Sequence, residues 1–180
     1  MKQKEYVVLL DENDNQIGLM EKMEAHRLGL LHRAFSVFIF RKKNEVVELL
    51  LQQRAQEKYH CGGLWTNSCC SHPREGEPVI EAGKRRLKEE MGIDIGFLEH
   101  VGSFLYRAEF QNGLIEHEID HVLIGTFDSD SIDFNQDEVD DYKWIELEQL
   151  KLDMEESPEK FTPWLEKALL VIPDNKIKVL

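Results

Sequence analysis

Two pairs of apolar segments, each pair separated by a short polar stretch, constrain the fold of the first half of the chain. Residues 6–20, YVVLLDENDNQIGLM, predict two short strands around an Asp/Asn turn, as in a hairpin. AFSVFIF at 34–40 and VVELLLQQ at 46–53 flank the polar RKKNE and predict a second hairpin. This half of the chain is therefore expected to be rich in strands.

Residues 76–93, GEPVIEAGKRRLKEEMGI, carry the signals of both ends of a helix. Pro78 suits the first helical turn, and Gly92 suits the C-terminal cap, because glycine adopts a left-handed backbone conformation readily. Apolar side chains recur between them at an approximately helical spacing, at Val79, Ala82, Leu87 and Met91. The segment predicts a helix.

The second half of the chain mixes strand and helix patterns. Strands are predicted at 101–110, 116–127 and 140–147. Residues 157–172 predict a helix that Pro163 interrupts early. Both kinds of element occur along the chain, so we expect an α/β fold of the mixed α+β kind, in which helices cover a mixed sheet.

Length and composition predict a single domain over residues 1–180. Apolar residues make up 42% and charged residues 32%, which suits a soluble globular protein. No apolar run approaches the roughly 20 residues that span a bilayer, and the first residues lack the pattern of a signal peptide. We expect a cytoplasmic protein without a membrane partner.

Net charge and cysteine content argue against a nucleic-acid-binding protein and against a disulfide-stabilised protein. The net charge of −13 argues against a nucleic-acid partner, because phosphate neutralisation needs a clustered excess of Lys and Arg. The cysteines, Cys61, Cys69 and Cys70, are odd in number, and cytoplasmic thiols mostly stay reduced. A disulfide framework is not expected, and an anionic ligand would need local cations or a metal.

The stretch TNSCCSHP, residues 66–73, brings two cysteines next to a histidine. In an extended segment Cys70 and His72 would point to one side and Cys69 to the other. Both thiols could be small buried hydrophobes. Alternatively, one of the thiols could act in catalysis, because a free thiol has a pKa of about 8.5 and can exchange its proton near neutral pH. A structural zinc site is a third interpretation that lacks paired C-x-x-C spacing; its candidate ligands are His60, Cys61, Cys69, Cys70 and His72.

Two carboxylates share one face of a predicted strand, because Glu116 and Glu118 are two residues apart. They could be solvated strand charges, since adjacent buried carboxylates repel unless a cation lies between them. The histidines that could join them are His26, His32 and His72. Three imidazoles and two carboxylates would suit Zn, Mn or Fe(II) if the fold brought them together.

The predicted helix offers a second cation site. Arg85 and Glu89, like Arg86 and Glu90, are four residues apart and could form exposed ion pairs worth about 0.3–0.5 kcal/mol each. Alternatively, Glu90 could hold Mg²⁺ together with substrate phosphate oxygens. The basic residues that could complete a diphosphate cradle are Lys22, Arg54, Lys58 and Arg86.

The segment from Ser71 to Ile93 resembles the Nudix box, G-x5-E-x7-R-E-U-x-E-E-x-G-U, where U is an aliphatic residue. The residues that match are Glu77, Arg85, Leu87, Glu89, Glu90, Gly92 and Ile93. Ser71 replaces the first glycine, and Arg86 replaces the glutamate that follows the arginine. In the Nudix family that glutamate belongs to the group that holds catalytic magnesium, so its loss argues against ordinary diphosphate hydrolysis.

Several separate motifs resemble type I isopentenyl-diphosphate isomerase: HRAFSVFIF, TNSCCSHP, FLYRA, EHE and FTPW, within the stretch from Lys22 to Trp164. The resemblance implies a Nudix-like mixed β-sheet sandwiched between helices. It also implies an enzyme of isoprenoid biosynthesis that interconverts isopentenyl and dimethylallyl diphosphates by protonation and deprotonation on opposite faces of the alkene. Cys61 and Gly62 stand where this family often has an aromatic-proline pair.

The resemblance implies roles for the candidate residues. Cys70 would be the catalytic thiol and Glu118 the opposing acid/base, with Tyr106 near one of them. Trp164 could stabilise a carbocation by cation–π attraction of up to about 2 kcal/mol, or it could simply anchor its helix. The implied sites are a Mn²⁺ or Zn²⁺ site at His26, His32, His72, Glu116 and Glu118, a Mg²⁺ site at Glu90 and the Cys70 carbonyl, and diphosphate contacts at Lys22, Arg54, Lys58 and Arg86.

The expected partner is a small allylic or homoallylic diphosphate, with the chain acting as a monomer or weak dimer. Two other functions remain open at this point. A Nudix hydrolase acting on a nucleoside or related diphosphate would release phosphate or nucleotide. A non-catalytic Nudix-like binding module would bind metal and diphosphate without turnover.

Overall fold

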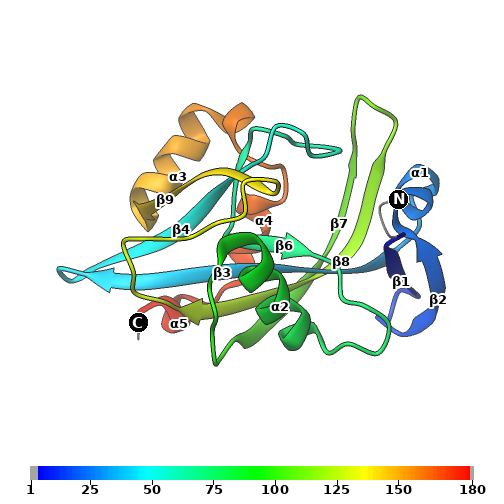
Figure 1. Cartoon of the computed structure of the whole chain (residues 1–180), viewed down its shortest axis with the longest axis horizontal. Coiled ribbons are helices and arrows are strands. Elements are labelled where there is room, and N and C mark those ends of the chain that lie inside the picture. Colours follow the sequence, from blue (N-terminus) through cyan, green and yellow to red (C-terminus); the bar gives the residue numbers. More distant parts are fainter. Residues whose placement is uncertain (1–3, 179–180) are drawn as a thin grey trace.

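The computed structural model describes residues 4–178 and arranges them around a mixed sheet (Figure 1). The strands are β1 (Tyr6–Leu10), β2 (Gln16–Glu21), β3 (His32–Lys43), β4 (Val46–Arg54), β5 (Trp65–Thr66), β6 (Cys69–Ser71), β7 (Glu99–Glu109), β8 (Ile115–Thr126) and β9 (Val139–Glu146). The helices are α1 (Lys22–Leu28), α2 (Val79–Met91), α3 (Leu147–Glu156), α4 (Leu165–Val171) and α5 (Asp174–Lys178), with a 3₁₀ turn at Pro158–Lys160.

Strand β3 lies at the centre of the sheet. It pairs antiparallel with β1, β4 and β6, and parallel with β8. The parallel register places His32 opposite Glu118, and the register with β6 places Ser36 opposite Cys70. On the other side of β8, β7 places Tyr106 opposite Glu118. The pairings thus bring β6 and β8, which are distant in the sequence, to the first half of β3.

The sheet is covered on both faces. In β3, Val37 and Ile39 pack in the apolar cluster that includes α2, whereas Phe38 and Phe40 pack in the cluster that includes α4. A strand buried on both faces has no polar side, which explains the continuous apolar run at 34–40. Figure 1 shows α2 on the near side of the sheet. The predicted mixed sheet between helices is confirmed.

Helix α2 is confirmed with both of its predicted ends. It begins after Pro78, whose carbonyl accepts the first helical hydrogen bond from Ala82 at 2.9 Å. It ends at Gly92, which has a φ of 66°. A Cβ at Gly92 would lie 2.2 Å from the carbonyl oxygen of Asp133, so this position requires glycine for space as well as for backbone conformation. The two predicted hairpins and the three later strands are also confirmed.

The predicted helix at 157–172 is wrong over its first half, because α4 begins only at Leu165. Pro163 lacks an N–H and disfavours a helical conformation at the residue before it. Thr162 instead donates its N–H to the carbonyl of Trp65 at 3.0 Å, which ties the segment to β5.

Helices α1, α3 and α5 were not predicted from the sequence. Glutamate is not a preferred N-cap residue, yet the Glu21 carboxylate caps α1 by accepting the N–H groups of Met23 and Glu24. Helix α3 directly follows β9 without a turn signal between them. Among the helices that the structure describes, none is long and apolar enough to cross a membrane.

The loop before α2 is held to the helix by a two-point ion pair. The guanidinium of Arg85 donates to both carboxylate oxygens of Glu77, at 2.7 and 2.9 Å, and the Arg74 N–H donates to the same carboxylate at 2.8 Å. The hydrogen bonds from Arg85 hold the pKa of Glu77 below its ordinary value, although partial burial opposes this.

Glu77→Gln is expected to lower the free energy of unfolding by about 1 kcal/mol at pH 7. Because the folded-state pKa is lowered, this stabilisation is complete above the ordinary value of 4.5 and disappears as pH falls through the lowered pKa. Urea unfolding at pH 7 and at pH 3 measures both effects. Glu81→Gln, which removes an exposed pair with Lys84, is the control and should change stability by less than about 0.5 kcal/mol. An equal deficit at both pH values would contradict the assignment.

Candidate active site

One pocket collects most of the polar residues that the sequence singles out. It opens beside the first half of β3, next to β6, β8 and α2. Its lining is mostly charged, imidazole or aromatic: Lys22, Ala34, Phe35, Arg54, Lys58, Tyr59, His60, Cys70, Ser71, His72, Arg86, Glu90, Glu116, Glu118, Asp120 and Trp164. The other three predicted site residues, His26, His32 and Tyr106, are buried next to lining residues.

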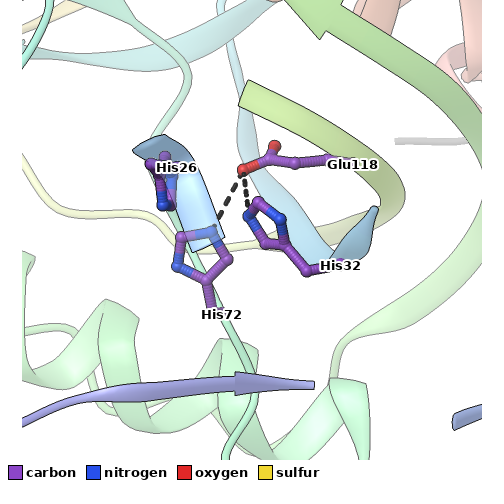
Figure 2. A group of neighbouring side chains, drawn as sticks. All are labelled: His26, His32, His72 and Glu118. Carbon is purple, nitrogen blue, oxygen red and sulfur yellow. Dashed lines mark hydrogen bonds and ion pairs between the residues drawn. The ribbon is translucent and has the colours of Figure 1, made fainter. Parts of the chain in front are cut away.

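Four of the five predicted metal ligands converge. Figure 2 shows His32 and His72 directed at the carboxylate of Glu118, with His26 beside them. The Nε2 atoms of His32 and His72 lie 3.3 and 3.0 Å from Glu118 Oε1. One potential ligand atom from each of the four residues lies within 4.8 Å of all the others. The side chains come from α1, β3, β8 and the segment after β6, so only the fold brings them together.

Backbone hydrogen bonds fix the imidazoles of His26 and His32 in the form that binds metal. Nδ1 of His26 lies 2.7 Å from the carbonyl of Lys22, and Nδ1 of His32 lies 2.8 Å from the carbonyl of Leu30. A carbonyl can only accept, so each Nδ1 carries the proton and each Nε2 presents a lone pair. Burial lowers the pKa of His26, and a neutral imidazole is the ligand form.

A lone pair on His32 Nε2 faces a carboxylate oxygen that also has only lone pairs to offer. At 3.3 Å in a buried setting this contact is repulsive unless a cation or a further proton lies between the atoms. Burial also lowers the pKa of His72 to about 3, so this imidazole is neutral at pH 7. The donor set therefore fits a divalent metal ion.

The fifth predicted ligand, Glu116, lies in an adjoining group. Its Oε1 is 2.8 Å from Nε2 of His60, and these two residues form a second potential metal-binding group with His26. Burial, together with the charge of Glu118, raises the pKa of Glu116. The sequence suggested His60 only as part of a zinc site with the cysteines. The position of His60 in the sequence does not predict its contact with Glu116, because His60 lies in the loop after β4 and Glu116 lies on β8.

The two adjacent cysteines point to different environments, as strand alternation predicts. Cys69 is fully buried in the apolar cluster of α2. Cys70 lines the pocket, with its Sγ 3.6 Å from Nη1 of Arg54. Burial raises the pKa of the Cys70 thiol to about 12 although Arg54 opposes this. The expectation of a thiol that loses its proton near neutral pH is therefore wrong for this environment: Cys70 holds its proton.

The basic residues of the pocket differ in how they are paired. Arg86 pairs with Glu90 and Glu89, Lys58 with Glu138, and Lys22 with Glu5. Both i,i+4 pairs predicted on α2, Arg85 with Glu89 and Arg86 with Glu90, are present, but Glu90 is buried rather than exposed.

Arg54 is the exception among the four basic residues. It is buried, and within residues 4–178 it forms no ion pair with a carboxylate; its guanidinium meets Cys70 and the carbonyl of His60 instead. A buried cation without an anionic partner is costly, which favours binding of an anionic ligand.

Trp164 lines the pocket just before the start of α4, and Tyr106 is buried next to it. Trp164 is buried and donates its indole N–H to Oδ1 of Asn67 at 3.2 Å. Its ring lies 6.3 Å from that of Tyr106, whose hydroxyl is buried without a hydrogen-bond partner in the described part of the chain. Burial raises the pKa of Tyr106, so the hydroxyl is neutral and has a proton to donate.

Comparisons with known proteins agree with this geometry. The NUDIX domain family matches residues 30–165. "Isopentenyl-diphosphate Delta-isomerase" of Photobacterium profundum is 52% identical over 166 residues, which cover 92% of each chain. "Isopentenyl-diphosphate Delta-isomerase 2" of Aromatoleum aromaticum is 49% identical and covers 91% of this chain and 84% of the relative. The chain belongs to the isopentenyl-diphosphate Delta-isomerase family of NUDIX-domain proteins.

A comparison with solved structures finds the same fold in another protein. The crystal structure of DR0079 from Deinococcus radiodurans superposes with a TM-score of 0.72 over 93% of this chain and 97% of that protein, at 23% identity. This likeness concerns the fold alone. Lys22 and His26 precede the residues that match the NUDIX domain, and α1 brings both to the pocket region.

Proposed function

We propose that the protein interconverts isopentenyl and dimethylallyl diphosphates, and so supplies both isomers for isoprenoid biosynthesis. Its relatives at about 50% identity are named isopentenyl-diphosphate Delta-isomerase. The structural observation that carries the proposal is the content of one pocket. It holds a buried thiol that keeps its proton, a carboxylate among imidazoles, and an arginine without a carboxylate partner.

The proton transfers can be assigned to named atoms. In the direction from isopentenyl diphosphate, the Cys70 S–H gives its proton to the terminal alkene carbon, which leaves a tertiary carbocation and a thiolate. The guanidinium of Arg54, 3.6 Å from Sγ, lowers the cost of that thiolate. Glu118 then removes a proton from the methylene next to the cation, and those electrons form the internal double bond. The reverse reaction exchanges the two roles.

The carboxylate must be ionised before it can accept that proton. Although burial raises the pKa of Glu118, the proton or cation that must lie between it and His32, together with the hydrogen bond to His72, holds this pKa below the ordinary value. The carbocation itself would react with water, so the pocket must exclude it. Trp164, which lines the pocket, offers an aromatic face to a cation, and this attraction reaches about 2 kcal/mol when desolvated.

We propose two metal sites. His26, His32, His72 and Glu118, with Glu116 from the adjoining group, would hold Mn²⁺ or Zn²⁺. Glu90 with the Cys70 carbonyl would hold Mg²⁺, with diphosphate contacts from Lys22, Arg54, Lys58 and Arg86. When bound, these ions supply positive charge that neutralises the diphosphate and the buried carboxylates.

We also propose where the chain works in the cell and how many copies act together. We infer that the chain works in the cytoplasm, because its three cysteines are free. We further propose one domain over residues 1–180, since the two larger apolar clusters pack on the same sheet, and action as a monomer or weak dimer.

Proton NMR with isopentenyl diphosphate in heavy water tests the proposed reaction. With Mg²⁺ and a trace of Mn²⁺ or Zn²⁺, the terminal vinylidene signals should disappear while dimethylallyl signals and deuterium incorporation grow, without free phosphate. Release of phosphate would support a Nudix hydrolase. An unchanged spectrum with bound metal would support a non-catalytic binding module.

Metal binding should stabilise the fold, because an unfolded chain does not assemble the four ligands. At a free Mn²⁺ or Zn²⁺ concentration 100 times the Kd, the gain is about 2.7 kcal/mol, which corresponds to a rise of about 5–10 °C in Tm. Differential scanning calorimetry of metal-stripped protein with and without added ion measures it, and EDTA should reverse the rise. A Tm that is independent of both ions would contradict the proposed centre.

A further inference from the structure

Asn67 lies in the turn between β5 and β6 and is fully buried. Its amide nitrogen donates to the carbonyls of Cys69, at 2.7 Å, and Val37, at 3.2 Å. Its amide oxygen accepts from the hydroxyl of Thr66 at 2.9 Å and from the indole N–H of Trp164 at 3.2 Å. An asparagine amide offers two N–H donors and two acceptor lone pairs, so all four are used here.

These partners allow only one orientation of the Asn67 amide. The carbonyls of Cys69 and Val37 can only accept, and the indole N–H of Trp164 can only donate. Turning the amide by 180° would place its oxygen against two carbonyls and its nitrogen against an N–H, which would leave these buried groups unsatisfied. The side chain is therefore held as a rigid link between its two groups of partners.

One end of this link is anchored to the strands beside the proposed catalytic thiol. Cys69 directly precedes Cys70 on β6, and Val37 lies opposite Cys69 on β3. The other end reaches Trp164, which is 97 residues away from Asn67 in the sequence. The link thus joins the strand of the thiol to the indole.

The backbone before Trp164 is attached to the sheet by separate hydrogen bonds. The Thr162 N–H donates to the carbonyl of Trp65 at 3.0 Å, and the hydroxyls of Thr162 and Thr66 lie 2.8 Å apart. These contacts fix where the segment lies, but they do not reach the indole ring. The hydrogen bond to Asn67 ends on the indole itself and so fixes the plane of the ring.

In this plane the indole face and the thiol meet at one guanidinium. The guanidinium carbon of Arg54 lies over the Trp164 ring, 5.4 Å from its centroid, and Nη1 of Arg54 is 3.6 Å from Sγ of Cys70. Trp164 and Cys70 both line the pocket. The face of this ring therefore already attracts a cation, on the side where the thiol lies.

We infer that Asn67 is a positioning residue of the proposed isomerase. It sets the plane of the Trp164 indole relative to the strand that carries Cys70, so that the aromatic face stays turned toward the thiol. Protonation of the alkene by that thiol would leave a cation, and a ring attracts a cation only when the cation lies over its face. The inference rests on the proposed function for this cation, whereas the hydrogen bond between Asn67 and the indole does not.

The first test follows the indole itself and needs no substrate. Asn67→Leu keeps the approximate size of the side chain but removes its donors and its acceptor. In proton–nitrogen NMR spectra the Trp164 indole signal, assigned by its absence from Trp164→Phe, should shift upfield, because a hydrogen bond moves an N–H proton downfield. The Trp144 signal is the internal control and should not move, since its N–H donates to the Ser129 carbonyl at 3.0 Å. An unchanged Trp164 signal would overturn the inference.

The second test separates positioning from substrate binding. Asn67→Leu should lower kcat in the isomerisation assay by about 10²-fold, the effect of a small misplacement in an active site. KM should change by less than about 3-fold, because the diphosphate contacts are untouched. In a Trp164→Phe background, which already lacks the indole N–H, the same substitution should lower kcat by less than about 10-fold. A kcat close to the wild-type value, or equal losses in both backgrounds, would overturn the inference.

Ser68→Ala is the matched control for a disturbed core. Ser68 is also fully buried, and its hydroxyl bonds to the backbone of Leu50 and Ile39, so its loss should lower stability but leave kcat close to that of the wild type. A kcat loss in this control as large as in Asn67→Leu would overturn the inference. If Asn67→Leu does not fold, Asn67→Ser, whose hydroxyl ends one atom short of the amide oxygen, gives the same readings. Absence of isomerisation in the wild type would refute the proposed function, while the indole signals would still test the role of Asn67.

Discussion

Cys70→Ser is expected to reduce isomerase turnover by about 10³-fold, the middle of the range for a lost general acid–base group. An alcohol is a much weaker acid than a thiol, and an alkene is a poor proton acceptor, so the proton donor limits the reaction. Arg54 lies 3.6 Å from Sγ and can stabilise a thiolate. Serine is nearly isosteric and occupies an extended strand position opposite Ser36, so the fold should be unchanged.

The NMR assay under substrate saturation measures this loss, with circular dichroism and Mn²⁺ affinity as checks that fold and metal centre persist. Cys61→Ser is the matched control. Burial also raises the pKa of the Cys61 thiol to about 12, but Cys61 does not line the pocket. Turnover of the Cys61→Ser variant should therefore stay close to that of the wild type. Near wild-type turnover in a folded, metal-binding Cys70→Ser protein would remove Cys70 from the reaction.

Local sequence patterns predict those parts of the site that depend on one element. The alternation of an extended strand separates Cys69 from Cys70, and the structure bears this out, with one thiol in the core and the other in the pocket. The start and end of α2 follow equally from Pro78 and Gly92. In each case the pattern is local, although the close approach of Asp133 adds a second, long-range reason for glycine at Gly92.

Convergence of the ligands depends on long-range pairing, which no local pattern contains. His32 meets Glu118 only because β3 pairs in parallel with β8, with His32 opposite Glu118. A resemblance to known motifs can imply such a meeting, but spacing alone cannot. The His60–Glu116 contact lacked even that support, because His60 lies in a loop whose path is set by Gly62 and by Arg54.

The pKa of Cys70 could not be inferred for a related reason. The ordinary value of a thiol applies in water, whereas burial in the pocket favours the neutral form. The sequence therefore predicts that Cys70 carries a proton that can be transferred. Whether the thiol keeps that proton at neutral pH depends on its burial, which the sequence does not show.

Glu118→Gln should produce the largest combined effect, because this residue serves both the metal centre and the proposed proton transfer. The amide keeps the size of the side chain but lacks the charge and cannot accept a proton. Two imidazoles, of His32 and His72, would then face a neutral group. Loss of a residue that only hydrogen-bonds to a metal ligand typically weakens metal binding by about 10- to 100-fold. Loss of the ligand itself should cost more, so Mn²⁺ affinity should fall by more than about 100-fold.

Saturating metal distinguishes the two roles of Glu118. If it were only a ligand, excess Mn²⁺ would restore turnover in Glu118→Gln; because we also assign it the proton from the substrate methylene, turnover should stay at least about 10³-fold below the wild type. Glu109→Gln, at the exposed end of β7 where Glu109 pairs with Arg107, is the control and should be unaffected. Titration by EPR and the NMR assay at saturating metal give the two readings separately. Full rescue by Mn²⁺ would leave Glu118 as a ligand and transfer the proton-accepting role to another carboxylate of the pocket lining, such as Glu116.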